Sequence, residues 1–290
     1  MPEPIIIEAA INGVTTRARN PNVPLAPEEI AADALACYDA GAAIVHHHLD
    51  RNGIGIEDAA ARYLETWRLV LAQRPDALIY PTVHPGPPRS YEHQVILAAT
   101  GMARIGIVDP GSLNLGGLNG NGVPAGGIVY DNSYDAIAQA FTICAKHRLG
   151  PSMAIYEPGF LRTVMAWWRA GQLPSGAMIK LYFAEEQGYI GAPFGLPPTP
   201  LALDAYLEIL GDCDVPWGVS VVGGDAGASA VAGLAIERGG HLHLGIEFYG
   251  GNRTPTNVEL VTEAAQRCVA AGRPPATPKE AAAILRLPRS

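Results

Sequence analysis

Cysteine is scarce in this sequence, and no motif joins one cysteine to another. The four cysteines among 290 residues are widely spaced and form no C-x-x-C pair; they are Cys37, Cys144, Cys213 and Cys268. In a chain of this length, such spacing indicates reduced core residues rather than a disulfide framework. We therefore expect a cytoplasmic protein.

Positive charge and long apolar runs are also lacking. The 20 Lys and Arg are outnumbered by 28 Asp and Glu, for a formal net charge of -8, which argues against nucleic acid as a partner. No run of about 18 apolar residues is present, so no membrane span is expected. The first residues, MPEPIIIEAAING, have neither a basic start nor a long apolar stretch and predict no signal peptide.

The sequence is rich in hydrophobic residues, and many glycines and prolines separate the apolar runs. Hydrophobic residues make up 48% of the chain and charged residues 17%, and the 33 glycines and 25 prolines fall between apolar runs. This composition predicts a large core with tight connections. We find no linker, and we expect residues 1–290 to form a single domain with a helical extension at its C-terminus.

Short β-branched runs alternate with longer amphipathic segments along the whole chain. We expect strands at 4–11, 42–49, 77–83, 102–108, 151–157, 177–183, 216–222 and 241–247. We expect helices at 27–40, 56–74, 90–99, 132–148, 159–171, 199–211, 226–237, 256–271 and 278–286.

Strict alternation of eight strand–helix units predicts an α/β fold of the (β/α)₈, or TIM, barrel type. The competing open sheet lacks its G-x-G-x-x-G fingerprint here. Residues 109–130 and 184–198 are expected to be irregular and to cover the active site.

Three consecutive histidines mark the end of the second predicted strand. Because side chains alternate along a strand, His46 and His48 share one face and His47 points away. Active sites of such barrels lie at the C-terminal strand ends, where this pair falls. The H-x-H pattern is compatible with a metal site and with a hydrogen-bonded core pair.

A carboxylate at the end of the eighth predicted strand favours the metal. Glu247 ends the run HLHLGIE, and a buried carboxylate requires a partner because its desolvation is costly. Two histidines and one carboxylate leave one coordination position open, which is typical of catalytic zinc. A salt bridge or a helix cap is the alternative role for Glu247.

The sequence resembles the β-keto acid cleavage enzymes, of which 3-keto-5-aminohexanoate cleavage enzyme is the type member. The matching segments run almost from end to end; they are AAING (9–13), 20–48, GSLNLG (111–116), YEPGF (156–160), GGHLHLGIE (239–247), TNVELV (256–261) and 272–281. The resemblance implies a (β/α)₈ barrel, a homo-oligomer, and zinc held by His46, His48 and Glu247. Other divalent transition metals suit the same ligands.

The resemblance also implies a reaction. Family members convert a β-keto acid and acetyl-CoA into a new CoA ester and acetoacetate, through enolate attack on the thioester and a retro-Claisen step. Each step develops negative charge on oxygen, which a Lewis-acidic metal stabilises. The expected partners are therefore a small keto acid and acetyl-CoA as co-substrate.

The acid–base residues of the family are altered in this chain. The family's base is an aspartate directly after the metal-binding glutamate, where Phe248 stands here. An orienting arginine aligns with Gly224, an N-terminal acidic position aligns near Val14, and a strand-end serine is replaced by Thr82, which keeps the hydroxyl. Loss of a base removes proton transfer worth roughly 10²–10⁴-fold in rate.

Three residues are candidates to replace the lost groups. His84 lies near the barrel mouth, and an imidazole can serve as a base, although His84 could equally be a third metal ligand or a solvated loop residue. Asp225 could supply a carboxylate or cap the next helix. Glu157 could orient the substrate or form a structural salt bridge.

Four further residues are candidates for substrate binding. Lys180, on the face of the sixth strand with Tyr182, could pair with a substrate carboxylate or form an ion pair between core and helix. Asn114 and Ser112 could contact the substrate or hydrogen-bond within a turn. Arg253 and the glycine-rich loop 223–227 could bind an anion, although an exposed arginine is usually solvated.

Three functions remain open on sequence grounds. The first is a metal-dependent acyl exchange on a β-keto acid with acetyl-CoA. The second is hydrolysis or hydration of a small acid by metal-activated water, and the third is a non-catalytic barrel that binds a small ligand. Turnover with or without CoA distinguishes them.

Overall fold

In the computed structural model, residues 3–50, 53–84, 90–186, 191 and 194–288 are described. Eight strands form one parallel sheet in the order β3-β2-β1-β10-β9-β8-β7-β4. They are β1 (Ile7–Ala10), β2 (Ile44–His47), β3 (Leu78–Pro81), β4 (Ile105–Val108), β7 (Gly150–Ile155), β8 (Met178–Ala184), β9 (Trp217–Val222) and β10 (His241–Leu244).

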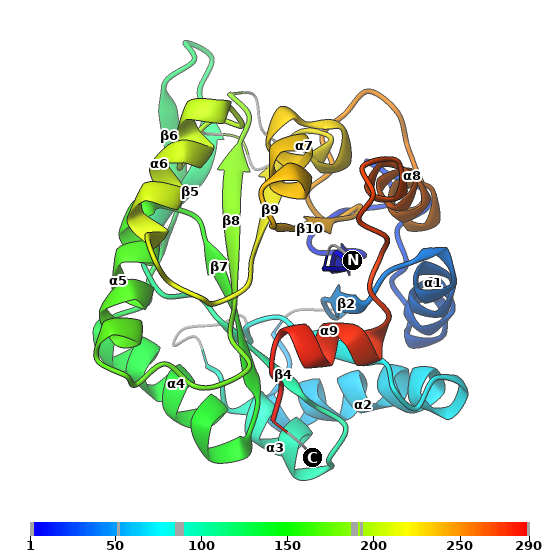
Figure 1. Cartoon of the computed structure of the whole chain (residues 1–290). Helices are drawn as coiled ribbons and strands as arrows, with labels where there is room; N and C mark the ends of the chain where they lie inside the picture. Colours follow the sequence, from blue (N-terminus) through cyan, green and yellow to red (C-terminus); the bar gives the residue numbers. More distant parts are fainter. Residues whose placement is uncertain (1–2, 51–52, 85–89, 187–190, 192–193, 289–290) are drawn as a thin grey trace.

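The two ends of this sheet, β3 and β4, pack against each other, and the sheet is thereby nearly closed into a ring. Helices surround the strands on the outside (Figure 1). They are α1 (Pro27–Ala40), α2 (Ile56–Gln73), α3 (His93–Ala99), α4 (Tyr134–His147), α5 (Pro158–Arg169), α6 (Pro200–Leu210), α7 (Ala230–Glu237), α8 (Asn257–Ala270) and α9 (Pro278–Ile284). The predicted (β/α)₈ barrel is confirmed.

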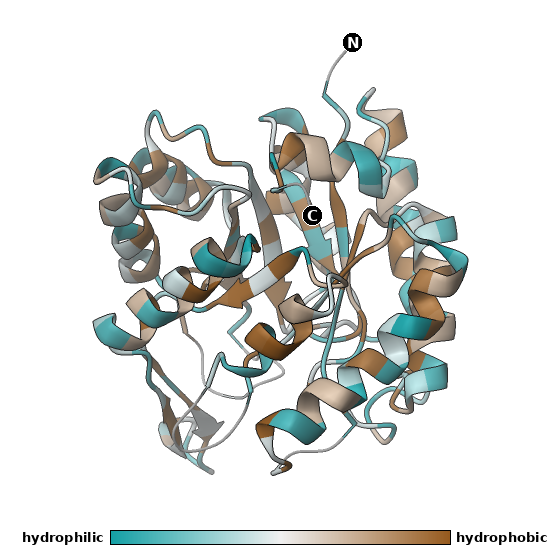
Figure 2. Ribbon diagram, turned by 90° about the horizontal axis from the view of Figure 1, so that it is seen from below, coloured by the Kyte–Doolittle hydropathy of each residue, from teal (hydrophilic) through white to brown (hydrophobic). Residues whose placement is uncertain are grey.

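The helix starts follow from local sequence signals. Pro27 occupies the first turn of α1, where its missing N–H costs no hydrogen bond, and the Glu29 carboxylate accepts from the backbone N–H groups of Leu25 and Ala26 at 2.9 and 3.0 Å. Thr256 and Glu259 form a reciprocal capping box at the start of α8. Several helices in Figure 2 carry hydrophobic residues on one side and hydrophilic residues on the other, as packing on a barrel requires.

The C-terminal extension covers one end of the barrel. Ile5 pairs with Pro275 just before α9, and Leu287 packs against Gly150 and Gly176 near the starts of β7 and β8. The N-terminal ends of these strands are therefore closed by the chain's own apolar residues. The opposite, C-terminal ends remain available for a site.

Two expectations about local structure were wrong. Residues 109–130 contain an antiparallel hairpin of β5 (Leu113–Leu118) and β6 (Pro124–Tyr130), which projects from the barrel (Figures 1 and 2). Its glycine-rich sequence obscured the strand pattern. The expected helix 226–237 is divided into a short 3₁₀ turn, η1 (Ala226–Ala228), and α7, because Ser229 adopts an extended conformation and caps α7. The other irregular segment, 184–198, lies partly outside the described residues.

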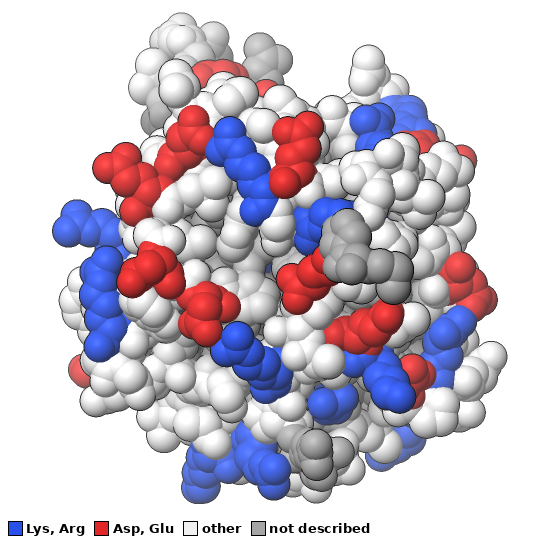
Figure 3. All heavy atoms as spheres, viewed as in Figure 1, with Lys and Arg blue, Asp and Glu red and all other residues white. Residues whose placement is uncertain are grey.

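The length and apolar character of the described helices bear on membrane crossing, and the charges on one face of the surface bear on polyanion binding. Among the described helices, none combines the length and the apolar character needed to cross a membrane. On the face shown in Figure 3, Lys and Arg side chains are interspersed with Asp and Glu. Such a mixture does not provide the clustered positive charge that a polyanion needs.

Candidate active site

The C-terminal ends of β2 and β10 bring three potential metal ligands together. The His46 Nε2 atom lies 3.5 Å from one Glu247 carboxylate oxygen, and the His48 Nε2 atom lies 3.1 Å from the other. One ligand atom from each residue lies within 4.8 Å of the other two. Donors about 2.1 Å from a tetrahedral ion are separated by roughly 3.4 Å. The arrangement therefore fits a single small cation.

Residues after β1 hold this cluster in place. The Asn12 side chain accepts from the His48 backbone N–H at 2.8 Å and donates to the His48 carbonyl at 3.2 Å. Gly13 has a φ of +56°, and a Cβ there would lie 2.1 Å from Glu247 Cγ, so a larger residue would displace the carboxylate. Thr15 donates to the Ile246 carbonyl at 3.1 Å. The Asn12-Gly13 pair is thus a positioning element that our sequence analysis did not identify.

Burial sets the charge of the cluster. Burial and the neighbouring His48 hold the pKa of His46 well below its usual 6.5, so His46 is neutral and its lone pair is available. Burial raises the pKa of Glu247, but the charge and hydrogen bond of His48, together with the charges of His243 and Lys180, outweigh burial, and the net pKa is lowered. Glu247 Oε2 has no hydrogen-bond partner among the described residues. A buried anion in this state needs a cation.

Two nearby histidines, His47 and His241, have structural partners instead. His47 points out of the barrel, where its Nε2 accepts from the Trp67 indole of α2 at 2.9 Å. The Nδ1 atom of His241 accepts from the backbone N–H of Ile6 at 3.0 Å. The alternation of side chains predicted for residues 46–48 is therefore confirmed.

A second cluster of polar residues fills the barrel beside the first. Glu8 Oε1 lies 3.2 Å from both the Lys180 ammonium and His243 Nε2, and it accepts from the Tyr80 hydroxyl. Lys180 also donates to that hydroxyl at 2.6 Å. All four side chains are buried. Lys180 thus pairs with a strand residue and not with a helix, and it still reaches the wall of the main cavity.

A cavity of about 1330 Å³ opens above the histidines and Glu247. Ligand sites usually measure roughly 300–1,000 Å³, so this one has room for two reactants. Its lining also contains Phe248 and four residues that were not predicted to belong to the site, namely Tyr130, Tyr156, Tyr182 and Asp109. Ala154, Tyr156 and Tyr182 follow the inward alternation of Ser152 and Lys180, and that signal could have identified them.

Thr82, His84 and Lys180 also line this cavity. Thr82 follows β3 directly, and its carbonyl oxygen lies 2.8 Å from His93 Nε2. The His84 ring lies 5.9 Å from the His93 ring. These three predicted residues therefore share one space with the metal-ligand cluster.

Glu157, Ser112 and Asn114 are absent from the described lining of the cavity. Glu157 lies one residue beyond the inward-facing Tyr156 and accepts from the Gly195 backbone N–H at 2.8 Å. Ser112 joins the base of the hairpin, because its hydroxyl donates to the Asn132 carbonyl at 3.1 Å and accepts from the Asn132 N–H at 2.8 Å. Asn114 lies exposed on β5.

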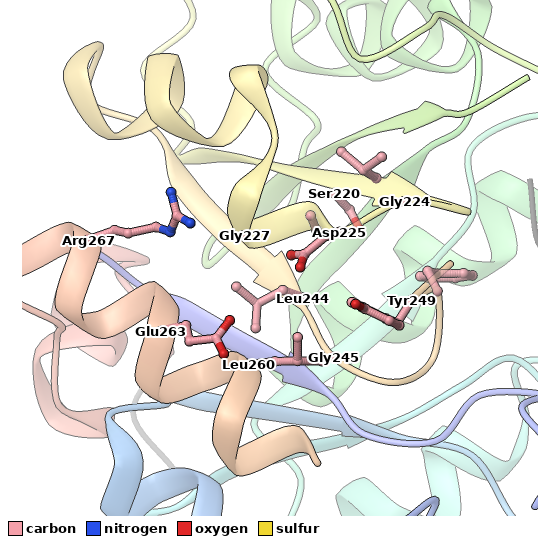
Figure 4. A pocket seen from close by; sticks show the side chains of 13 residues that line it. Ser220, Gly224, Asp225, Gly227, Leu244, Gly245, Tyr249, Leu260, Glu263 and Arg267 are labelled. Carbon is pink, nitrogen blue, oxygen red and sulfur yellow. The ribbon is translucent and has the colours of Figure 1, made fainter. Parts of the chain in front are cut away.

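Asp225 and Arg253 lie near a different and much smaller pocket. Asp225 caps η1 by accepting from the Ala228 N–H at 3.2 Å, while Arg253 forms a bidentate pair with Glu263 at 2.7 and 2.5 Å. Asp225, Glu263 and Arg267 surround this pocket of about 10 Å³ (Figure 4). Two carboxylates around a space for about one water do not favour an anion.

Comparison with known proteins identifies the family of this chain. The family model for beta-keto acid cleavage enzyme matches residues 4–287. The chain is 26% identical to a 3-keto-5-aminohexanoate cleavage enzyme of Acetoanaerobium sticklandii, over 98% of each chain. It is 27% identical to a 3-oxoadipate:acetyl-CoA acetyltransferase of Cupriavidus necator, over 99% of this chain and 96% of that protein.

The solved structures provide a fold-level comparison. The apo structure of ObcA superposes with a TM-score of 0.68 at 15% identity, over 93% of this chain and 66% of ObcA. At this identity the likeness concerns the barrel alone. The match of the family model over nearly the whole sequence goes further, and the chain belongs to the β-keto acid cleavage enzyme family.

Proposed function

We propose that this protein is a zinc-dependent enzyme that converts a β-keto acid and acetyl-CoA into a new CoA ester and acetoacetate. The observation that carries the proposal is the neutral His46 facing a buried, charged Glu247 beside His48 at the floor of a cavity large enough for two reactants. The family match over residues 4–287 supports the reaction class.

His46, His48 and Glu247 are the residues that would hold the metal. Imidazole and carboxylate donors suit zinc and also manganese, iron or cobalt. When bound, a divalent ion supplies Lewis acidity that stabilises negative charge on the oxygens of a keto acid. The remaining chemistry falls to side chains of this chain.

We infer that Lys180 binds the carboxylate of the keto acid. Its ammonium lies in the cavity wall, paired with Glu8 at 3.2 Å and bonded to Tyr80 at 2.6 Å. These contacts fix the position of a positive charge at the floor before the substrate arrives, which lowers the cost of ordering the site. Thr82, which also lines the cavity, offers a hydroxyl to the keto acid.

We assign the removal of the C2 proton to His84. Phe248 occupies the position of the family's aspartate and cannot accept a proton, whereas His84 lines the cavity and an imidazole is suited to proton transfer near neutral pH. Replacement of His84 by Gln should lower kcat by roughly 10²–10⁴-fold. Bound metal should be retained.

A substrate panel tests the function directly. Purified protein loaded with zinc is incubated with a series of β-keto acids and acetyl-CoA, and the release of acetoacetate is followed. Acetoacetate formation that depends on both reactants supports the proposal, and His46→Ala should abolish both the bound zinc and the activity. Turnover without CoA would instead indicate a hydrolase, and ligand binding without any turnover would indicate a non-catalytic barrel.

A further inference from the structure

Four aromatic side chains form a continuous surface on one side of the main cavity, which we call the aromatic wall. Ring centroids are separated by 6.2 Å between Tyr130 and Tyr156, by 4.7 Å between Tyr156 and Tyr182, and by 5.4 Å between Tyr182 and Phe248. All four side chains line the cavity. The wall begins at Phe248, the residue after Glu247, and extends to the hairpin strand β6.

The wall borders the main hydrophobic core, against which Tyr130 and Tyr156 pack, but Tyr182 and Phe248 belong to a second cluster. Tyr182 is buried in a small cluster with Ala154, Ala184 and Val222, against which Tyr156 and Phe248 pack. Ala154 also lines the cavity, and its small side chain leaves room in front of the rings. A ligand in that room would remove apolar ring surface from water, which is favourable in proportion to the area covered.

The polar groups of the wall are uncharged hydroxyls. The structure shows no hydrogen bond from the hydroxyl of Tyr156 or Tyr182 to a described residue, and burial raises the pKa of both phenols well above 10. They can therefore donate to a neutral acceptor such as an ether or a carbonyl oxygen. Tyr130 donates its hydroxyl to Asp109.

The lysine and arginine that line the described cavity are not available to a charged tail. Arg17 pairs with Glu29 at 2.6 Å. Lys180 lies 6.0 Å from the centroid of the Tyr182 ring, but it pairs with Glu8 at 3.2 Å and is assigned above to the carboxylate of the keto acid head. A second carboxylate, placed in the tail against these rings, would lose its hydration without gaining a cation of its own, which is unfavourable.

We propose that the aromatic wall selects β-keto acids whose tail beyond the carbonyl carries an aromatic or bulky apolar group rather than a carboxylate. The keto acid head rests on the function proposed above, whereas the tail preference rests on the wall alone. Phe248 gives the wall its end nearest to Glu247, so an apolar tail would begin to contact rings directly beyond the reacting carbons.

Binding of matched ligands tests this preference without requiring turnover. Calorimetric titration of the zinc-loaded full chain would use 3-oxo-5-phenylpentanoate and 3-oxoadipate, which share one head and differ in their tails. We expect the phenyl ligand to bind on the order of 10-fold or more tightly than 3-oxoadipate. Equal affinities, or a preference for the carboxylate tail, would overturn the proposal.

Variants locate the effect on the wall. Phe248→Leu should lower affinity for the phenyl ligand several-fold and leave affinity for acetoacetate, which has the head but no tail, unchanged. Phe194→Leu is the matched control, because Phe194 lies 5.8 Å from Tyr156 but is not in the cavity lining, and it should retain the preference. If Phe248→Leu does not fold, Tyr156→Leu serves the same purpose.

The two proposals can fail separately. Absence of acetoacetate binding, together with absence of turnover for every acid, would contradict the proposed function. Normal binding of acetoacetate without discrimination among tails would contradict only the role of the aromatic wall.

Discussion

Two glutamates lie close together in this barrel, and their surroundings differ. Glu8 is surrounded by the Lys180 ammonium, the Tyr80 hydroxyl and His243. Each glutamate has one carboxylate oxygen without a hydrogen-bond partner among the described residues, but Glu247 faces only the histidines His46 and His48 in its described ion pairs. The rings of His46 and His243 are only 6.5 Å apart. The first carboxylate is neutralised by the chain itself, whereas the second is arranged to receive a cation from outside.

A third carboxylate, that of the partly buried Asp33, has only neutral hydrogen-bond partners among the described residues. Asp33 of α1 accepts from the Asn257 amide at 2.7 Å and from the Cys37 thiol. Burial outweighs these neutral donors and raises its pKa from 3.8 to about 6. The pKa of Glu8 is instead lowered, because Lys180 and His243 outweigh burial. The partners of a desolvated carboxylate therefore decide its pKa. Charged partners lower the pKa of Glu8, whereas the neutral donors of Asp33 leave its pKa raised by burial.

The largest effect should come from removing the negative charge of Glu247, which would bind the metal ion. Glu247→Gln should abolish stoichiometric zinc and lower turnover by roughly 10²–10⁴-fold, since metal stabilisation of charge is worth several kcal/mol. Metal analysis and the acetoacetate assay measure both. Glu157→Gln, which changes a carboxylate outside the described cavity lining, is the control. Full zinc occupancy in Glu247→Gln would remove the distinction between the two glutamates.

Breaking the self-neutralised pair should affect stability more than metal binding. Lys180→Met leaves Glu8 as an uncompensated buried charge and should lower the free energy of unfolding by about 3–5 kcal/mol. Adding Glu8→Leu should recover most of this loss, because the buried charge is removed with its partner. Denaturant unfolding measures both variants. A double variant as unstable as the single one would contradict the comparison.

The contribution of Asp33 to the free energy of unfolding should depend on pH. Its pKa is higher in the folded than in the unfolded chain, so its contribution is fully present below about pH 4 and is lost as pH rises through about 6. The rise in the pKa of Asp33 from 3.8 to about 6 corresponds to at most about 3 kcal/mol in the free energy of unfolding. Asp33→Asn should therefore be more stable than the parent by about 1–3 kcal/mol at pH 8, with the difference vanishing near pH 4. Thermal unfolding at both pH values checks the sign.

The smallest effect is expected at an exposed ion pair. Arg253 is bound to Glu263 at the surface, with side chains 45% and 44% exposed, and solvent screens such pairs. Arg253→Ala should change stability by less than about 1 kcal/mol and should leave the KM for the keto acid unchanged within error. A large increase in KM would return Arg253 to the substrate site.

The hydrophobic pattern determined the barrel and much of the site. Alternation along β2 separated His46 and His48 from His47, because the period of a strand is two residues whatever surrounds it. Closure of eight strands then placed strand ends at one rim, where Glu247 and Thr82 lie in the cavity wall. The same rule led us to expect that Glu157 points into the site, but the inward-facing residue is Tyr156, one position earlier.

Only the tertiary structure decided which polar residues are already paired. Lys180 and Glu8 are 172 residues apart, and Arg253 turns to Glu263 on α8, so no local spacing reveals either pair. The aromatic wall likewise unites residues from β6, β8, and the segments after β7 and β10. Sequence sets the direction of each side chain along its own element, whereas barrel closure sets the distances between elements, and burial and charge depend on those distances.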